Sequence, residues 1–195
     1  MECRSEDPNC IPAILPVILI GGCSQSSGQL ISLAAEDGTV TESPLTASTS
    51  GGIVNIGDLA DATVIQLFLS FDISALQGGL MSSATVSIYQ GSSNGTPSNI
   101  TPFFVDHLDF GTLDTSDFGT SALTQGFHEI TNVTNASFKT FDVSPFLQAD
   151  LLAGRTRSQY RIRATSNADG SADFIGISTG DSGTNPPALD YTVCF

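Results

Sequence analysis

The residues best suited to chemistry in this sequence are its four cysteines, Cys3, Cys10, Cys23 and Cys194. They form no C-x-x-C pair and no Cys/His cluster, which argues against a zinc site and favours disulfide bonds formed in an oxidising compartment. The spacing leaves the connectivity open. Cys23 with Cys194 is an attractive pair because the first and last strands of a β-sandwich are often neighbours, and Cys3 and Cys10 would then close a small loop or reach another subunit.

Catalytic groups are scarce. His107 and His128 are the only histidines, and neither lies in a recognised motif, so we expect both to be ordinary strand or loop residues. Asp72 and Asp142 each follow a phenylalanine, and we expect them to make structural hydrogen bonds at strand ends. The sequence contains no G-x-S-x-G, H-E-x-x-H or P-loop motif. Since catalysis needs convergent acid, base or nucleophilic groups, we expect the protein not to be an enzyme.

One acidic stretch offers oxygen ligands of the kind that calcium prefers. Asn167, Asp169 and Asp173 surround a glycine turn at Gly170. Calcium binds carboxylate and amide oxygens around such turns, but the ligand series is incomplete here. A plain turn is therefore the simpler interpretation, and we expect no other cofactor.

The charge balance limits the partners. The chain carries 20 acidic and 6 basic residues, for a net charge of −14. This balance argues against nucleic acid, because phosphate contacts need clustered lysine and arginine. The one basic cluster comprises Arg155, Arg157, Arg161 and Arg163, and its spacing predicts a single solvated face of a strand.

Sugars enter the interpretation in two ways. N-x-[ST] sequons at Asn94, Asn99, Asn132 and Asn135 are candidate glycosylation sites in loops. Carbohydrate-binding sites usually use exposed aromatic rings, but the chain has no tryptophan and its three tyrosines (Tyr89, Tyr160 and Tyr191) fall in predicted strands. We expect the 12 phenylalanines to fill the core. A surface polysaccharide stays an open partner.

The N-terminus contains an apolar run from Ile11 to Ile20, too short for a transmembrane helix of about 20 residues and interrupted by Pro12 and Pro16. Its acidic flank argues against a secretory signal. Residues 19–23 resemble a bacterial lipobox that would lipidate Cys23. The alternative that we favour is an extended strand that inserts into a neighbouring subunit. Its apolar residues are Ile11, Ile14, Leu15, Val17, Ile18, Leu19 and Ile20.

The rest of the chain alternates short strands with turns, a pattern typical of a sandwich or jelly roll. We predict a flexible hinge at residues 23–28, so that residues 1–28 precede a sandwich domain over 29–195. The predicted fold is an all-β, antiparallel, jelly-roll-like β-sandwich with an N-terminal extended hydrophobic strand. The expected strands span residues 29–35, 64–71, 85–90, 103–108, 127–131, 137–143, 159–164, 172–178 and 188–194. One short helix is expected over residues 144–153, with Pro145 in its first turn.

Several of these segments are similar to DNRLRE-type domains. The segments are Leu69–Ser74, Ser83–Tyr89, Phe141–Ser144 and Asn185–Val193, and the resemblance covers about residues 50–193. It implies a jelly-roll-like sandwich of the kind found in surface and secreted proteins, related to carbohydrate-binding modules. It also implies binding or structural work outside the cell. The family's tryptophans are absent here.

These observations favour a structural subunit of an extracellular filament or surface assembly. Such a subunit would polymerise with copies of itself by donor-strand insertion, supported by disulfides, without spanning a membrane. The alternatives are a surface lipoprotein or carbohydrate-binding module tethered at Cys23, and a virion fibre or decoration protein.

Overall fold

The computed structural model describes residues 22–167 and 169–195, so the expectations for Cys3, Cys10 and residues 11–20 lie outside the described residues. The described residues form twelve strands. The strands are β1 (Gln25–Ile31), β2 (Gly38–Thr41), β3 (Thr46–Ser48), β4 (Ile53–Asp58), β5 (Val64–Asp72), β6 (Leu80–Asn94), β7 (Phe103–Leu108), β8 (Thr124–Ile130), β9 (Ser137–Asp142), β10 (Arg157–Arg163), β11 (Asp173–Ser178) and β12 (Ala188–Cys194). The helices are η1 (Ser74–Leu76), η2 (Pro97–Ile100), η3 (Thr115–Gly119) and α1 (Ser144–Leu152).

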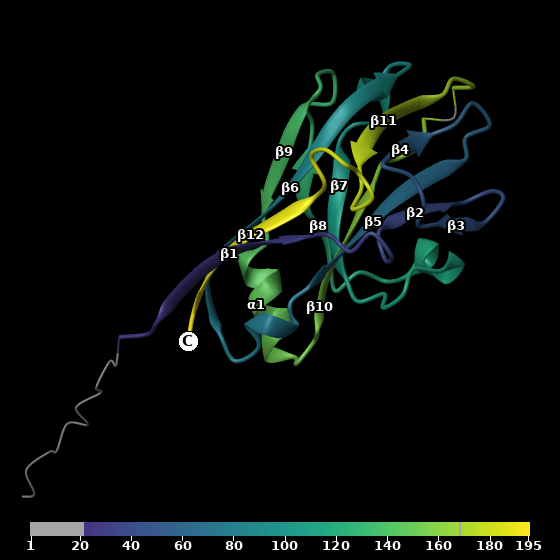
Figure 1. The fold of residues 1–195 in the computed structure, drawn as a ribbon. Coiled ribbons are helices and arrows are strands. Elements are labelled where there is room, and N and C mark those ends of the chain that lie inside the picture. The colour runs from purple at the N-terminus through teal and green to yellow at the C-terminus, as the bar shows by residue number, and fades with distance from the viewer. Residues whose placement is uncertain (1–21, 168) are drawn as a thin grey trace, which may run out of the picture.

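The strands make one antiparallel sheet in the order β1-β12-β6-β11-β4-β5-β10-β7-β8. β9 pairs with the other edge of β6, and the β2–β3 hairpin pairs with β5. This long sheet curls over on itself, so that its two halves face each other across a shared core (Figure 1). The predicted all-β, sandwich-like fold is confirmed.

Strand periodicity explains how the core fills. In β6, Val86 and Ile88 are fully buried, whereas Ser87 and Tyr89 on the opposite face are half-buried. Successive strand residues point to opposite faces, so this alternation produces one inward face and one outward face. The alternation predicted for residues 85–90 is confirmed.

β5 differs because both of its faces are covered. Leu67, Leu69 and Phe71 point into the main core, and Phe68 between them belongs to a second apolar cluster on the outer face. Residues 109–123, which include η3, supply much of that second cluster and so lie over the outer face. In sequence, a strand that is buried on both faces shows a continuous apolar run, as residues 67–69 do.

Two strand ends are closed by aspartates. Asp72 accepts a hydrogen bond from the Ser74 amide (3.0 Å), and Asp142 accepts one from the Ser144 amide (2.9 Å). The predicted structural role of both aspartates is confirmed. The Asp142 bond also positions the start of α1, in which Pro145 occupies the first turn as expected.

Local signals were misleading in three places. Residues 25–28, expected in a flexible hinge, lie in β1 and pair with β12 because cross-strand partners satisfy their backbone. The short strands β2, β3 and β4 were not predicted. The phenylalanines do not all enter the core, since Phe138 and Phe195 are each 54% exposed.

The arginine cluster is not a solvated face, contrary to our expectation. Arg161 is only 7% exposed, and it donates to Asp106 from Nη2 at 2.7 Å. Arg163 donates to the same carboxylate from Nε at 2.7 Å, and Arg157 donates to Glu36 from Nε at 3.0 Å. The physical reason is that residues 118–122 lie over Arg161 and Arg163, and covered charges must be paired.

Asp106 is the centre of this charged layer. Its side chain is fully buried, and it also accepts a bond from the Gly126 amide (2.8 Å). Burial alone would raise the pKa of Asp106, but the hydrogen bonds from Arg163, Arg161 and Gly126 hold it below its ordinary value. Stability from this carboxylate is therefore present near neutral pH and is lost as the pH falls through its lowered pKa.

We predict that Asp106→Asn lowers the free energy of unfolding by about 3 to 5 kcal/mol at pH 7, because it leaves two guanidinium groups without a buried counter-charge. Asp109→Asn is the matched control. Asp109 also pairs with an arginine, Arg155, but its side chain is 51% exposed, so its loss should cost less than about 1 kcal/mol. Chemical denaturation at pH 7 measures both variants, and equal effects would contradict the assignment.

Candidate functional site

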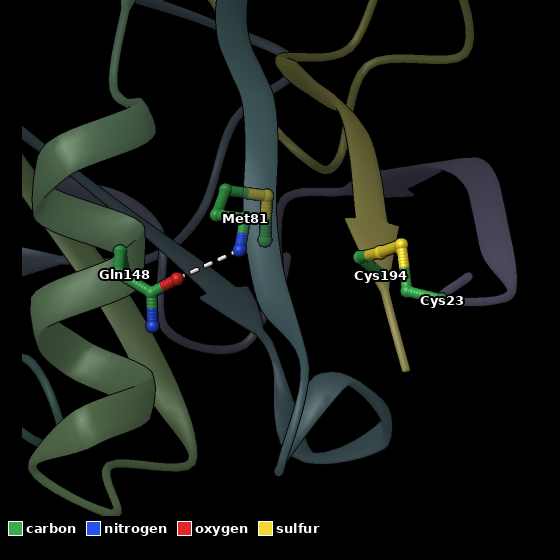
Figure 2. The surroundings of a disulfide bond; sticks show 4 residues. All are labelled: Cys23, Met81, Gln148 and Cys194. Atoms are coloured by element: carbon green, nitrogen blue, oxygen red, sulfur yellow. Dashed lines mark hydrogen bonds between the residues drawn. A yellow bond between two sulfur atoms is a disulfide. The ribbon is translucent and has the colours of Figure 1, made fainter. Parts of the chain in front are cut away.

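The two ends of the described chain are joined covalently. Cys23, just before β1, forms a disulfide with Cys194, the last residue of β12, with the two Cα atoms 5.4 Å apart (Figure 2). Beside the bond, the backbone amides of Ser24 and Phe195 donate to each other's carbonyl groups at 3.0 and 3.1 Å. The favoured pairing of Cys23 with Cys194 is confirmed, and it fixes the start of β1 to the end of β12.

The start of β6 supports this end of the molecule. Gln148 on α1 accepts a hydrogen bond from the Met81 amide through Oε1 at 2.7 Å (Figure 2). Leu80, the cross-strand partner of Cys194, is 64% exposed, and Phe195 is 54% exposed. Exposed apolar side chains thus lie beside the disulfide. We call the disulfide with Leu80 and Phe195 the base of the sandwich.

The disulfide bears on two interpretations of Cys23. Lipidation would need the Cys23 sulfur for a thioether, but that sulfur is bonded to Cys194. The structure therefore argues against a lipid tether at this residue. Disulfides form and persist in oxidising compartments, so the bond points to a secreted or otherwise oxidising environment.

A second feature is an open seam between β8 and β9. Among the described residues, β8 pairs only with β7 and β9 pairs only with β6, so each strand has one free edge. A hollow of about 260 Å³ lies between them. It is lined by His128–Asn132 and Ser137–Thr140. Lys139 is 8% exposed there, and burial lowers its pKa.

The two histidines occupy different settings. His107 in β7 is 2% exposed, and its Nε2 lies 3.0 Å from both carboxylate oxygens of the fully buried Asp150 on α1. Arg155 adds a 3.2 Å bond to the same carboxylate. This network ties α1 to the sheet and is closed to substrates. His128 lies in β8 at the seam, as a strand residue.

The proposed calcium ligands do come together, with one addition. Asn167 donates from Nδ2 to Asp169 (3.0 Å) and to Asp173 (3.2 Å). Strand pairing places Asp58 directly opposite Asp173, and Asp58 Oδ1 is buried with no partner among the described residues. Only the β4–β11 register brings in Asp58, so local sequence could not reveal it. Within the described ranges, no group of three His, Cys, Asp or Glu side chains is arranged to hold a metal ion.

The sequons and aromatic residues are also placed. Asn94, Asn99, Asn132 and Asn135 are all exposed, although Asn94 ends β6 rather than lying in a loop. Tyr160 is fully buried, and Tyr191 packs against the core from β12. The ring of Tyr89 is tilted by 59° against the exposed ring of Phe138, with the ring centroids 5.1 Å apart, which makes a small aromatic patch on the outer face of β6 and β9.

One buried acid has an unusual proton affinity. Asp37 is 1% exposed and accepts hydrogen bonds from the Ser70 amide (2.9 Å) and the Gly180 amide (3.1 Å). Burial raises its pKa to about 7 from an ordinary value of 3.8, despite these bonds. Asp37 therefore ties the β1–β2 connection to β5 and to the loop after β11, at some electrostatic cost when it is ionised.

Comparison with protein-family models finds none that matches the chain, and comparison with curated proteins finds no significant match. Within the described parts of the chain, no helix combines the length and the apolar character needed to cross a membrane.

We predict that replacing Cys23 and Cys194 together by serine lowers the free energy of unfolding by about 2 to 5 kcal/mol, because the bond closes a long loop. The comparison is best made with Cys3 and Cys10 already replaced by serine, so that no other pairing contributes. Amide exchange in β1 should rise. Peptide mapping that links Cys23 to a cysteine other than Cys194 would contradict the structure.

A second prediction concerns pH. Because the folded-state pKa of Asp37 lies above its unfolded value, its contribution to stability is present at low pH and is lost as the pH rises from about 4 to 7. Asp37→Asn should remove a slope of about 1.4 kcal/mol per pH unit over that window. Asp61→Asn is the control, since Asp61 is exposed and its pKa is lowered by hydrogen bonds from Thr63. Urea denaturation across this range tests the difference, and an unchanged slope in the Asp37 variant would contradict it.

Proposed function

We propose that the protein is a structural subunit of an extracellular filament or surface assembly, in which residues 11–20 of one copy add as a strand to another copy. The observation that carries the proposal is the Cys23–Cys194 disulfide at the base of the sandwich. The DNRLRE-type relationship is part of the proposal. Its motifs fall on β5, β6, β9 and β12, which surround one core.

The disulfide supports this function because of where it lies. A pull on the N-terminal segment reaches the sandwich at Cys23 and passes through a covalent bond to β12. β1 is an edge strand, held to the sheet by β12 alone among the described strands. Without the bond, the same pull would peel β1 away one hydrogen bond at a time. A domain that is held in an assembly through its N-terminal segment needs a covalent bond that keeps β1 attached to the sheet.

The seam between β8 and β9 supports the acceptor side of the proposal. Free strand edges are templates for an added strand, whose backbone they satisfy through hydrogen bonds. The buried Ile130 lines the seam and would meet one apolar face of the inserted strand. The exposed Leu80 and Phe195 at the base would add an apolar contact between copies.

The test uses the full oxidised chain and a variant carrying Ile14→Asp and Ile18→Asp. We expect the wild type to form oligomers or filaments in light scattering and electron microscopy, and the double variant to stay monomeric, because charged residues do not insert into an apolar contact. The matched control is Ile14→Val with Ile18→Val, which keeps the strand apolar and β-branched and should assemble. The variants change no residue of the described sandwich, so their unfolding should match wild type.

A photo-crosslinking residue at position 18 identifies the acceptor. In a mixture of isotope-labelled and unlabelled chains, it should join residues 128–140 of a different copy. A wild-type chain that stays monomeric at high concentration, or crosslinks formed only within one chain, would overturn the proposal.

A further inference from the structure

A second hollow lies on the outer face of the sheet, away from the base and the seam. It has a volume of about 440 Å³, within the range of about 300 to 1,000 Å³ that is usual for small-molecule sites. Residues 118–122 form one wall, and β5 and β10 form the floor. Its polar side chains are Gln66, Thr120, Ser121, Gln125, Arg161 and Arg163.

Gln66 lacks a hydrogen-bond donor. Its side chain is 7% exposed, and its Oε1 atom is buried with no partner among the described residues. Buried acceptors are nearly always satisfied, because an unmet one costs its full desolvation energy. Gln66 also lines the hollow, so a molecule that binds there and reaches this atom would supply the missing donor.

The arginines supply charge that is only half balanced. Arg161 and Arg163 share the single carboxylate of Asp106, which leaves one net positive charge on the floor of the hollow. Arg163 uses Nε and Nη2 for Asp106, while its Nη1 makes no hydrogen bond to any described residue. Its guanidinium group lies 5.0 Å from the centre of the Phe104 ring, which holds it in place. Among the described residues that line the hollow, none is acidic.

We propose that this hollow binds a small carboxylate that also carries hydroxyl groups, such as a uronic acid. The ligand carboxylate accepts from Nη1 of Arg163, and a ligand hydroxyl donates to Oε1 of Gln66. Thr120, Ser121 and Gln125 offer further polar partners to the remaining hydroxyl groups. A fully ionised phosphate or sulfate would leave Gln66 without a donor, and a neutral sugar would leave the charge unused.

The proposal is independent of the assembly function, since no residue lines both this hollow and the one at the seam, and none belongs to the base. The required chemistry could come from a uronic acid unit within a polysaccharide or from a free hydroxy acid. Both sources present the same carboxylate and hydroxyl groups to the hollow.

The experiment is a titration of the isotope-labelled, full-length chain with D-glucuronate, followed by NMR of the Gln66 side-chain amide and the Arg163 guanidinium group. We expect saturable shifts with a dissociation constant in about the millimolar range. D-Glucose lacks the carboxylate and acetate lacks the hydroxyl groups, so each should bind at least about tenfold more weakly. The affinity for glucuronate should fall as salt is raised.

Two variants separate binding from folding. Gln66→Met should weaken binding at least about tenfold with no loss of stability, because it removes an unsatisfied acceptor. Gln25→Met is the matched control on the exposed β1 strand and should bind like wild type. Arg163→Gln should lower the affinity for glucuronate and make that affinity less dependent on salt. Arg163→Gln also removes a partner of Asp106 and can fail to fold for that reason alone. In that case the binding affinity of the Gln66→Met variant tests the proposal.

An oligogalacturonide and monomeric galacturonate distinguish the two sources. Tighter binding of the oligomer assigns the site to a polysaccharide, and equal binding assigns it to a free acid. The proposal is overturned if glucuronate shifts no signal from the hollow, if glucose binds as well as glucuronate, or if the Gln66 variant keeps full affinity. Repeating the titration with Ile14→Asp/Ile18→Asp keeps this result separate from the test of assembly.

Discussion

The pairing of β1 with β12, locked by a disulfide, is the constraint on which the rest of this fold depends. The curled sheet starts with an edge strand, and its partner is the last strand of the chain. The Cys23–Cys194 bond fixes these two strands at one end, and seven cross-strand pairs from Gln25 to Ile31 continue the contact. β12 also pairs with β6, the longest strand of the sheet. The disulfide therefore fixes β1 relative to β6 through β12.

The outer face of β5 and β10 buries charged side chains. Residues 109–123 cover this face and exclude water from Arg161 and Asp106. Pairing then becomes obligatory, because an isolated charge in such a place is very costly. Arginine suits this role better than lysine, since its planar fork reaches Asp106 and the Thr120 carbonyl at the same time. The charged layer and the apolar cluster therefore both hold the loop above this face.

Sequence reasoning succeeded where the physical cause is local. The bounds predicted for β7 and β12 match the structure, because alternating apolar residues and flanking turns mark them clearly. The helix at residues 144–152 was predicted from Pro145 and its neighbours. The pairing of Cys23 with Cys194 followed from the general closeness of first and last strands. In each case the deciding information lies within a few residues or in a rule about topology.

It failed where the cause is distant in the chain. The spacing of the arginines describes one strand face correctly, but it cannot show that residues 109–123 fold back over that face. Asp58 and Asp173 are 115 positions apart in the sequence, and only the β4–β11 register makes them neighbours. The sequence did not single out Gln66 as a binding residue either. A glutamine in a strand is ordinary until the structure shows that its Oε1 atom is buried without a hydrogen-bond donor among the described residues.

The distribution of charge links these features to the proposed ligand. Arg155 contacts both Asp109 and Asp150, and Arg157 contacts both Glu36 and Asp72, so each has two carboxylate partners. Arg161 and Arg163 instead share Asp106. In a chain of net charge −14, the excess of positive charge thus falls at one place on this face. An anion repelled by most of the surface is attracted there, and the unmet acceptor of Gln66 selects among anions for one that can also donate.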